Sequence, residues 1–544
     1  MSELLVENKV QFQRLGTMLD CSRNGVMTVQ SIKKWVDIIS DLGYNTLLLY
    51  MEDTYEVDEN PYFGYMRGRY SQEELREIDA YASKKGMELI PCIQTLAHLN
   101  AIVRWPEYWH HVDKDDILLA GDDRVYALID KMFASLDKCI SGRIINIGMD
   151  EAHMIGRGKY YDLHGPSDRF QVLIDHLKRV SEIGAKYGFR FLMWSDMFFR
   201  LATGGKYDPE VEIRDEIKKQ IPDNVQLVYW NYWSKDKNRY DQLLQAHKKI
   251  QEDIWFAGGV RMWSGFATHN TSSMRTIKAA MESCLEQGIQ NFTVTLWGDN
   301  GAECSKYATL PVLFYASELA KGNKSIKSIK EKFKEKYGIS FERFMLLELP
   351  HTPNKCADNL ANADKYLFYN DCFMGLADST ISGIESEQYA ACARKLALLK
   401  KHPQWGYLFA TQQALCEVLA IKAEIGVKTH EIYTSGDKEA LKNLILEYRQ
   451  LRKKIKVFHK VYKEQWFLEN KPHGFDVQDL RIGGVLARVQ SCEERLQDLY
   501  DGKINRIEEL EEMQLDIFGN GEMFTQNHGV VLNYWNRMVT ANII

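Results

Sequence analysis

The stretch RIINIGMDEAHMIG, residues 143–156, decides how the rest of the chain is interpreted. A short apolar run, Ile144 to Ile147, passes through a glycine into two adjacent carboxylates, Asp150 and Glu151. This pattern predicts a buried strand that delivers both acids to its carboxyl end, where an α/β barrel carries its chemistry. An acidic pair after a strand is also typical of a helix N-cap or a solvated turn, so the interpretation depends on the other segments.

Seven further apolar runs resemble this strand, and helically periodic stretches lie between them. Such alternation predicts a parallel sheet covered by helices, and eight units are the number that closes a (β/α)8 TIM barrel. The expected strands are residues 15–21, 45–50, 87–91, 144–147, 190–194, 225–230, 254–258 and 291–295. Capping signals bound the helices, as at Thr28, a candidate N-cap, and at Ser71 with Glu74, a capping-box pattern.

Beyond about residue 322 the strand pattern stops. Residues 384–401, 438–467 and 485–512 are long, charged and helically periodic, which indicates a mainly α-helical C-terminal domain. We therefore expect an α/β chain with a (β/α)8 catalytic barrel over residues 1–322 and a helical domain over residues 323–544. A length of 544 residues suits two or three domains.

The composition is that of an ordinary globular protein, with 45% hydrophobic and 26% charged residues and a formal net charge of −6. Neither nucleic acid nor membrane is therefore an expected partner. The amino terminus has no apolar core of signal-peptide length, and no run reaches the ~20 apolar residues of a membrane span, so we expect a cytoplasmic location. Ten cysteines without a CxxC pair favour reduced thiols. A homodimer is left open.

Polar and aromatic side chains gather where the predicted strands end, at the upper rim of the expected barrel. They are Arg23, Glu52, Asp53, His98, Asp150, Glu151, Trp194, Asp196, Trp230, Tyr232, Trp263, Trp297 and Asp299. Indole and phenol rings pack on the C–H faces of sugars while carboxylates and guanidinium groups bind hydroxyls, so the rim predicts a carbohydrate pocket. A plainer interpretation exists for single residues, since Trp194 and Trp230 could simply cover the barrel core.

The phrase NIGMDEAHMIG resembles glycoside hydrolase family 20, the β-N-acetylhexosaminidases, in which an adjacent Asp-Glu pair follows barrel strand four. The short, unsecreted members related to hexosaminidase D are the most similar, and the likeness extends over about residues 10–320. LDCSR resembles the family segment with an aspartate and a sugar-binding arginine, here Asp20 and Arg23. TLAHL resembles the segment that carries a histidine, here His98, although Leu-Ala replaces the usual Pro-Gly. LWGDN resembles the strand-eight segment with Trp297 and Asp299.

The resemblance implies an exo-β-N-acetylhexosaminidase that removes terminal GlcNAc or GalNAc from a glycan by a retaining, substrate-assisted mechanism. In this interpretation Glu151 is the general acid and base, and Asp150 orients the 2-acetamido group of the sugar, whose oxygen attacks the anomeric carbon. The implied substrate-binding residues are Arg23, His98, Trp194, Trp230, Tyr232, Trp297 and Asp299. Tyr232 resembles the family tyrosine that contacts the acetamido oxygen, with Tyr229 and Tyr240 as alternatives.

The chemistry of the residues agrees with this implication. An ordinary retaining glycosidase needs two carboxyl groups ~5 to 5.5 Å apart on opposite sides of the anomeric carbon, whereas neighbours on one strand end suit substrate assistance. Adjacent carboxyls also disfavour double ionisation and should titrate as a coupled pair. His98, directed towards Glu151 and backed by Glu52 or Asp53, could contribute to this tuning, although a histidine satisfied within the core is an alternative.

No metal or cofactor is expected, because the sequence contains neither HxH nor HExxH spacing and no Gly-rich phosphate motif. Two alternative functions stay open. One is a non-catalytic carbohydrate-binding barrel, and the other is a different acetamido-dependent hydrolase, such as an O-GlcNAc-removing enzyme. A shared fold cannot separate the latter from an exo-hexosaminidase.

Overall fold

The computed structural model describes residues 9–205, 210–351, 360–517, 519 and 530–543. Eight parallel strands close into a barrel in the order β1-β10-β9-β8-β7-β6-β3-β2. They are β1 (Arg14–Asp20), β2 (Thr46–Glu52), β3 (Glu88–Ile93), β6 (Ile144–Asn146), β7 (Arg190–Trp194), β8 (Val225–Trp230), β9 (Trp255–Gly259) and β10 (Asn291–Leu296). Each strand overlaps one of the eight predicted segments, and the predicted barrel is confirmed.

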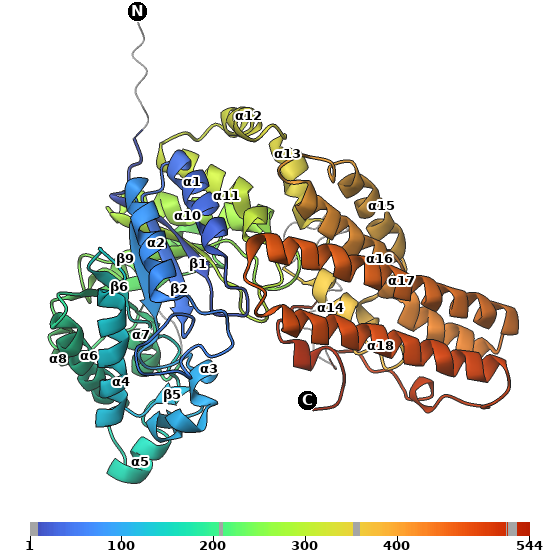
Figure 1. The fold of residues 1–544 in the computed structure, drawn as a ribbon, viewed down its shortest axis with the longest axis horizontal. Coiled ribbons are helices and arrows are strands. Elements are labelled where there is room, and N and C mark those ends of the chain that lie inside the picture. The colour runs from blue at the N-terminus through green and yellow to red at the C-terminus, as the bar shows by residue number, and fades with distance from the viewer. Residues whose placement is uncertain (1–8, 206–209, 352–359, 518, 520–529, 544) are drawn as a thin grey trace, which may run out of the picture.

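Helices cover the outside of the barrel (Figure 1). The longer ones are α1 (Val29–Leu42), α2 (Gln72–Lys84), α4 (Asp123–Asp137), α6 (Arg169–Ala185), α9 (Lys237–Lys248), α10 (Asn270–Glu286) and α11 (Leu310–Ala320). The shorter ones are α3 (Asn100–Val103), α5 (Lys159–His164), α7 (Asp196–Thr203) and α8 (Asp215–Lys218). The predicted caps are present, because the Thr28 hydroxyl accepts the Ser31 N–H and the reciprocal bonds of the Ser71–Glu74 capping box both form.

A short β-hairpin before α4 was not predicted. Two short antiparallel strands, β4 (Val112–Lys114) and β5 (Ile117–Leu118), lie in the long connection between β3 and α4. Their sequence is too short and too polar to produce a strand pattern. The hairpin stabilises a neighbouring loop, since Asp113 accepts the N–H groups of Gly156 and Tyr160.

The interior of the barrel is filled by side chains rather than hollow. Its buried cluster consists of Met18, Leu48, Tyr50, Ile90, Cys92, Ile144, Leu192, Trp194, Val228, Trp255 and Ala257. Trp230 and Trp297 pack against this cluster and are only partly buried. The core therefore ends in aromatic rings at the carboxyl ends of the strands, and these rings form the floor of the space above the barrel.

The C-terminal part is helical, as predicted, with three long helices packed against one another beside the barrel (Figure 1). Its helices are α12 (Ile326–Tyr337), α13 (Phe341–Phe344), α14 (Ala363–Tyr369), α15 (Glu385–Ala397), α16 (Gly406–Ser435), α17 (Lys438–Glu469) and α18 (Phe475–Tyr500). The domain boundary at residue 322 stays a prediction. Within the described part of the chain, no helix is both long and apolar enough to cross a membrane.

The predicted helical segment 485–512 is wrong at both ends, because α18 spans Phe475–Tyr500. Gly483 and Gly484 weaken the helical pattern near the start, yet both lie inside the helix, which tertiary packing stabilises. Past its end, Gly502 has a left-handed backbone (φ +73°) that an α-helix cannot continue through.

Two helix glycines provide a test of this packing. A Cβ added at Gly184 would lie 2.1 Å from the ring of Phe191, which is itself packed against Phe133 with ring centroids 5.4 Å apart. Gly184→Ala should therefore lower stability by about 1–3 kcal/mol. Gly483→Ala, whose Cβ meets nothing within 4 Å, should instead raise it by up to about 1 kcal/mol. Calorimetric melting curves would measure both changes, and shifts of the same sign would contradict this description of the packing.

Candidate active site

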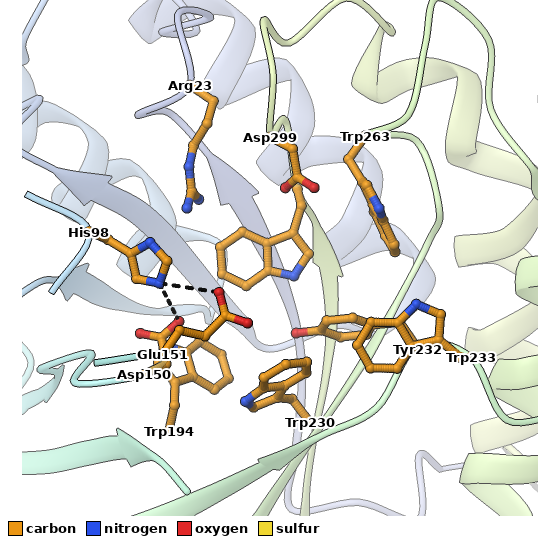
Figure 2. A pocket seen from close by; sticks show the side chains of 11 residues that line it. Arg23, His98, Asp150, Glu151, Trp194, Trp230, Tyr232, Trp233, Trp263 and Asp299 are labelled. Atoms are coloured by element: carbon orange, nitrogen blue, oxygen red, sulfur yellow. Dashed lines mark ion pairs between the residues drawn. The ribbon is translucent and has the colours of Figure 1, made fainter. Parts of the chain in front are cut away.

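A pocket of about 580 Å³, including space open to solvent, lies at the carboxyl ends of the barrel strands (Figure 2). Its lining residues are Arg23, His98, Asp150, Glu151, Trp194, Trp230, Tyr232, Trp233, Trp263, Trp297 and Asp299. All nine residues predicted for the site are in this set. The structure thus brings the predicted residues together, whereas the role of each stays a prediction.

The turn after β6 delivers Asp150 and Glu151. Gly148, Met149 and Glu151 all have left-handed backbones, with φ of +73°, +67° and +53°. Gly148 is required, because a Cβ there would lie 2.0 Å from the amide oxygen of Gln94. The Asp150 side chain is 12% exposed and the Glu151 side chain 41% exposed. The turn therefore sends one carboxylate into the protein and leaves the other at the opening of the pocket.

Asp150 is surrounded by groups that stabilise its charge. The Gln94 amide N–H donates to Oδ1 at 2.8 Å, and His98 Nε2 lies 3.2 Å from Oδ2. Burial alone would raise the pKa of Asp150, but the charge of His98 and these contacts outweigh it and lower the pKa below 3.8. Reciprocally, burial opposes the charge of His98, yet Asp150 raises the pKa of His98 to about 9.

The position of His98 differs from the expectation that it would be directed towards Glu151. Its Nε2 is 3.7 Å from Glu151 Oε2 and thus closer to Asp150, because the turn points Asp150 inward and Glu151 outward. Glu52 helps to raise the pKa of His98, as expected, whereas Asp53 pairs with Arg67. His98 lines the pocket and its side chain is 22% exposed, so the alternative of a histidine satisfied within the core is wrong.

Asp196 and Arg200 complete the surroundings of Glu151. Asp196 was predicted to lie at the rim but was given no role, and Arg200 was not identified from the sequence. Asp196 Oδ2 accepts the backbone N–H of Glu151 at 3.1 Å and the Nε–H of Arg200 at 3.1 Å. Arg200 Nη2 in turn lies 3.8 Å from Glu151 Oε1. Burial, followed by the charge of Asp150, raises the pKa of Asp196 to about 7. Its place two residues after the Trp194 strand end was the available signal.

Arg23 is fixed by two carboxylates and two rings. Its Nη1 lies 3.1 Å from Asp20 Oδ2 and its Nη2 3.1 Å from Glu52 Oε1. The guanidinium also lies 4.6 Å from the Tyr50 ring centroid and 5.2 Å from that of Trp297. These contacts leave it little rotational freedom, which suits a residue that binds a polar ligand group in one direction.

Asp299 faces the open space of the pocket, near Trp263 (Figure 2). The protein around the cavity removes water from it and raises its pKa to about 6, while the charge of Arg23 opposes this rise. A carboxylate and a guanidinium in the same pocket can together accept from and donate to the hydroxyls of a ligand.

Aromatic rings form the rest of the wall. Trp230 and Tyr232 are stacked with centroids 5.3 Å apart, and Trp263 lies edge-on to Tyr232. Of the three candidate tyrosines, Tyr232 lines the pocket, while Tyr229 packs in the core against His247. The hydroxyl of the third candidate, Tyr240, donates to the backbone oxygen of Ser234.

Two family models match this chain. The family model "Glycosyl hydrolase family 20, catalytic domain" matches residues 12–254, and the model "Glycoside Hydrolase 20C C-terminal domain" matches residues 342–529. The chain belongs to glycoside hydrolase family 20. It is therefore a glycoside hydrolase. The match to the catalytic-domain model ends before Trp297 and Asp299. The place of these two residues in the pocket therefore rests on the structure and not on the family match.

Individual relatives are distant. Hexosaminidase D of Bos taurus is 26% identical over 271 residues, covering 46% of this chain and 70% of that protein. A β-hexosaminidase of Vibrio furnissii is 23% identical over 27% of this chain and 30% of its own length. Among solved structures, an exo β-N-acetylglucosaminidase of Vibrio harveyi in complex with N-acetylglucosamine has a TM-score of 0.44 at 13% identity, over 62% of this chain and 59% of that one. A β-N-acetylhexosaminidase of Bacteroides fragilis has a TM-score of 0.45 at 18% identity, over 62% and 71%.

The His98–Asp150 pair predicts a pH dependence of stability. The pKa of His98 is raised from 6.5 to about 9 in the folded state, so the pair should stabilise the fold fully below pH 6.5 and lose that contribution as the pH rises to about 9. The free energies of unfolding of wild type and His98→Gln should therefore converge across this range, from a difference of at most about 3 kcal/mol, and their melting temperatures should converge with them.

The exposed His110 offers a matched control, because His110→Gln should follow the wild type at every pH. A constant difference between His98→Gln and wild type from pH 6 to pH 9.5 would show that the ion pair does not form.

Proposed function

We propose that this enzyme is an exo-β-N-acetylhexosaminidase that uses the acetamido group of its substrate as the nucleophile. One observation carries the proposal: buried, charged Asp150 and half-exposed Glu151 lie next to each other on one turn. Neighbours on one turn cannot occupy opposite sides of an anomeric carbon, as the direct double-displacement mechanism requires. The relatives named above are hexosaminidases, which supports the same substrate class.

The acetamido group of a terminal N-acetylhexosamine would occupy the aromatic part of the pocket, between Trp194, Trp230 and Tyr232. There Asp150 accepts the acetamido N–H, and the Tyr232 hydroxyl donates to the acetamido oxygen. A charged Asp150 suits this role, because the nitrogen gains positive charge as the oxygen attacks. The raised pKa of His98 keeps a cation beside Asp150 and so favours the charged carboxylate at neutral pH.

The reaction proceeds in two steps. In the first, the acetamido oxygen bonds to C1, the C1–O bond to the leaving group breaks, and Glu151 gives its proton to the leaving oxygen. In the second, Glu151 takes a proton from water, whose oxygen bonds to C1 and opens the oxazolinium ring. Each face of C1 is attacked once, so the configuration is retained. Exposure of Glu151 at the opening of the pocket suits both proton transfers.

The polar residues of the pocket favour exo action, which is the removal of a sugar from the non-reducing end of a chain. Arg23 and Asp299 would bind the hydroxyls at the non-reducing end, and a pocket that pairs with hydroxyls rejects sugars that leave these groups unpaired. The natural partner is thus a glycan with terminal N-acetylhexosamine. A cytoplasmic location stays a prediction, while the preference for GlcNAc or GalNAc and the possibility of a homodimer stay open and are tested separately.

Substitutions of the two carboxylates should separate their roles. General acid catalysis contributes ~10² to 10⁴-fold, and a good leaving group needs little of it. Glu151→Gln should therefore lose that factor on an oligosaccharide but less than about 10-fold on a dinitrophenyl glycoside. Asp150→Asn should lose similar factors on both substrates, because its defect lies in the internal nucleophile. Values of kcat/KM for the two substrates test this difference, because kcat/KM reports the first step and excludes the later role of Glu151 as a base.

The exposed Glu182 provides a control, since Glu182→Gln removes a carboxylate far from the pocket lining. Equal losses on both substrates for Glu151→Gln, or recovery of Asp150→Asn on the dinitrophenyl glycoside, would contradict the assigned roles.

A further inference from the structure

The loop after β10 carries Trp297 and Asp299 and is strained. Asp299 and Ala302 have left-handed backbones with φ of +30° and +52°, conformations that residues other than glycine rarely adopt. Such strain costs about 1–3 kcal/mol per residue and persists only where the surroundings impose it. The barrel holds the start of the loop through the hydrogen bond from Gly298 N–H to Asp20 Oδ2 at 2.8 Å and through the packing of Trp297 against Arg23, Tyr50 and Trp194. Further along the loop, Asn300, Gly301 and Glu303 are bound by the helical domain.

Asn300, the residue after Asp299, receives most of these contacts. Its backbone oxygen accepts from Lys365 Nζ at 3.1 Å and from Arg481 Nη1 at 3.0 Å. Its side-chain oxygen accepts from Arg481 Nη2 at 3.1 Å and from the backbone N–H of Trp535 at 3.2 Å. Lys365 lies on α14 and Arg481 on α18, so two helices of the C-terminal domain bind one residue of the loop.

Glu303 balances the charge of the two cations. Its Oε2 lies 2.7 Å from Lys365 Nζ, and its Oε1 lies 3.2 Å from Arg481 Nη1. The side chains of Lys365 and Glu303 are 0% and 2% exposed, and that of Arg481 is 11% exposed. Ion pairs at this depth repay their desolvation only when the hydrogen bonds around them are complete, and the Asn300 oxygens complete them. Such a network tolerates few alternative positions of the loop.

Further contacts of the loop come from the same domain. The Gln478 amide on α18 donates to the Gly301 oxygen at 2.8 Å, and the Tyr462 hydroxyl on α17 donates to the Glu303 oxygen at 3.1 Å. Arg481 also lines a second cleft, of about 990 Å³ including open solvent, which shares Arg23, His98 and Asp299 with the sugar pocket. The helical domain therefore reaches the edge of the active site.

We propose that the helical domain is a working part of the active site, in which Lys365 and Arg481 are positioning residues that act through Asn300 to fix Asp299 and Trp297 against the non-reducing sugar. The inference rests on the proposed function, because it concerns how that sugar is bound. A carboxylate that binds hydroxyls must keep its direction, and a displacement of 1 Å can cost ~10²-fold in rate. The domain thereby determines how closely the pocket fits its sugar.

The test compares Arg481→Gln with Arg488→Gln, using nitrophenyl N-acetylglucosaminide as the substrate. Arg488 lies two turns further along α18 and pairs with buried Asp371 at 2.7 Å, but it makes no contact with the loop among the described residues. Arg481→Gln should lower kcat/KM by about 10- to 100-fold, with KM raised, whereas Arg488→Gln should leave kcat/KM within about twofold of wild type.

A double-mutant cycle separates positioning from general stability. In an Asp299→Ala background, Arg481→Gln should lower kcat/KM by a clearly smaller factor than it does in the wild type, because one of the two groups that it positions has already been removed. Where Arg481→Gln does not fold, Asn300→Ala replaces it, since it removes one acceptor of Arg481 and leaves the buried ion pairs intact. Asn300→Ala should also lower kcat/KM, by a smaller factor than is expected for Arg481→Gln.

Equal losses for Arg481→Gln and Arg488→Gln would overturn the inference, as would additive losses in the cycle. A wild-type enzyme without turnover of this substrate would overturn the proposed function instead, so the two failures are distinguishable. Melting temperatures of all variants show whether a loss of activity reflects a loss of fold.

Discussion

Carboxylates on adjacent residues can differ in chemical role only if the backbone places them in different surroundings. Here the left-handed turn after β6 does so, with Asp150 inside and Glu151 at the opening of the pocket. The neighbouring strands stabilise that turn. Gln94, which follows β3, binds the Met149 N–H and Asp150, and Asp196, which follows β7, accepts the Glu151 N–H. Because β3 and β7 flank β6 in the closed barrel, the fold itself supplies both partners.

From this constraint the electrostatics follow. Asp150 raises the pKa of His98, and the cation that results lowers the pKa of Asp150. Burial raises the pKa of Asp196, which binds the backbone N–H of Glu151, so the carboxyl groups of the site experience different environments. Division of labour between carboxyl groups commonly arises in this way, from surroundings rather than from residue type.

Much of the fold and of the pocket was predictable, because both depend on short-range patterns. Apolar runs marked all eight strands, and side chains such as Asp299 were found because they directly follow a predicted strand. Gln94 was not found, since its role depends on a contact with Asp150, 56 residues away, which no local pattern reports. The hydrogen bond from Arg481 to Asn300 joins residues that are 181 positions apart in the sequence, so only the folded chain reveals it.

The central claim, that the acetamido oxygen of the substrate is the nucleophile, has a direct test. Nitrophenyl glycosides of N-acetyl-, N-fluoroacetyl- and N-trifluoroacetylglucosamine differ in the electron density of that oxygen and little in their other contacts. Since a well-placed internal nucleophile is worth up to ~10⁵ to 10⁸ M in effective concentration, weakening it should lower kcat/KM by several powers of ten across the series. Values that stay constant across the series would show that an enzyme side chain attacks instead.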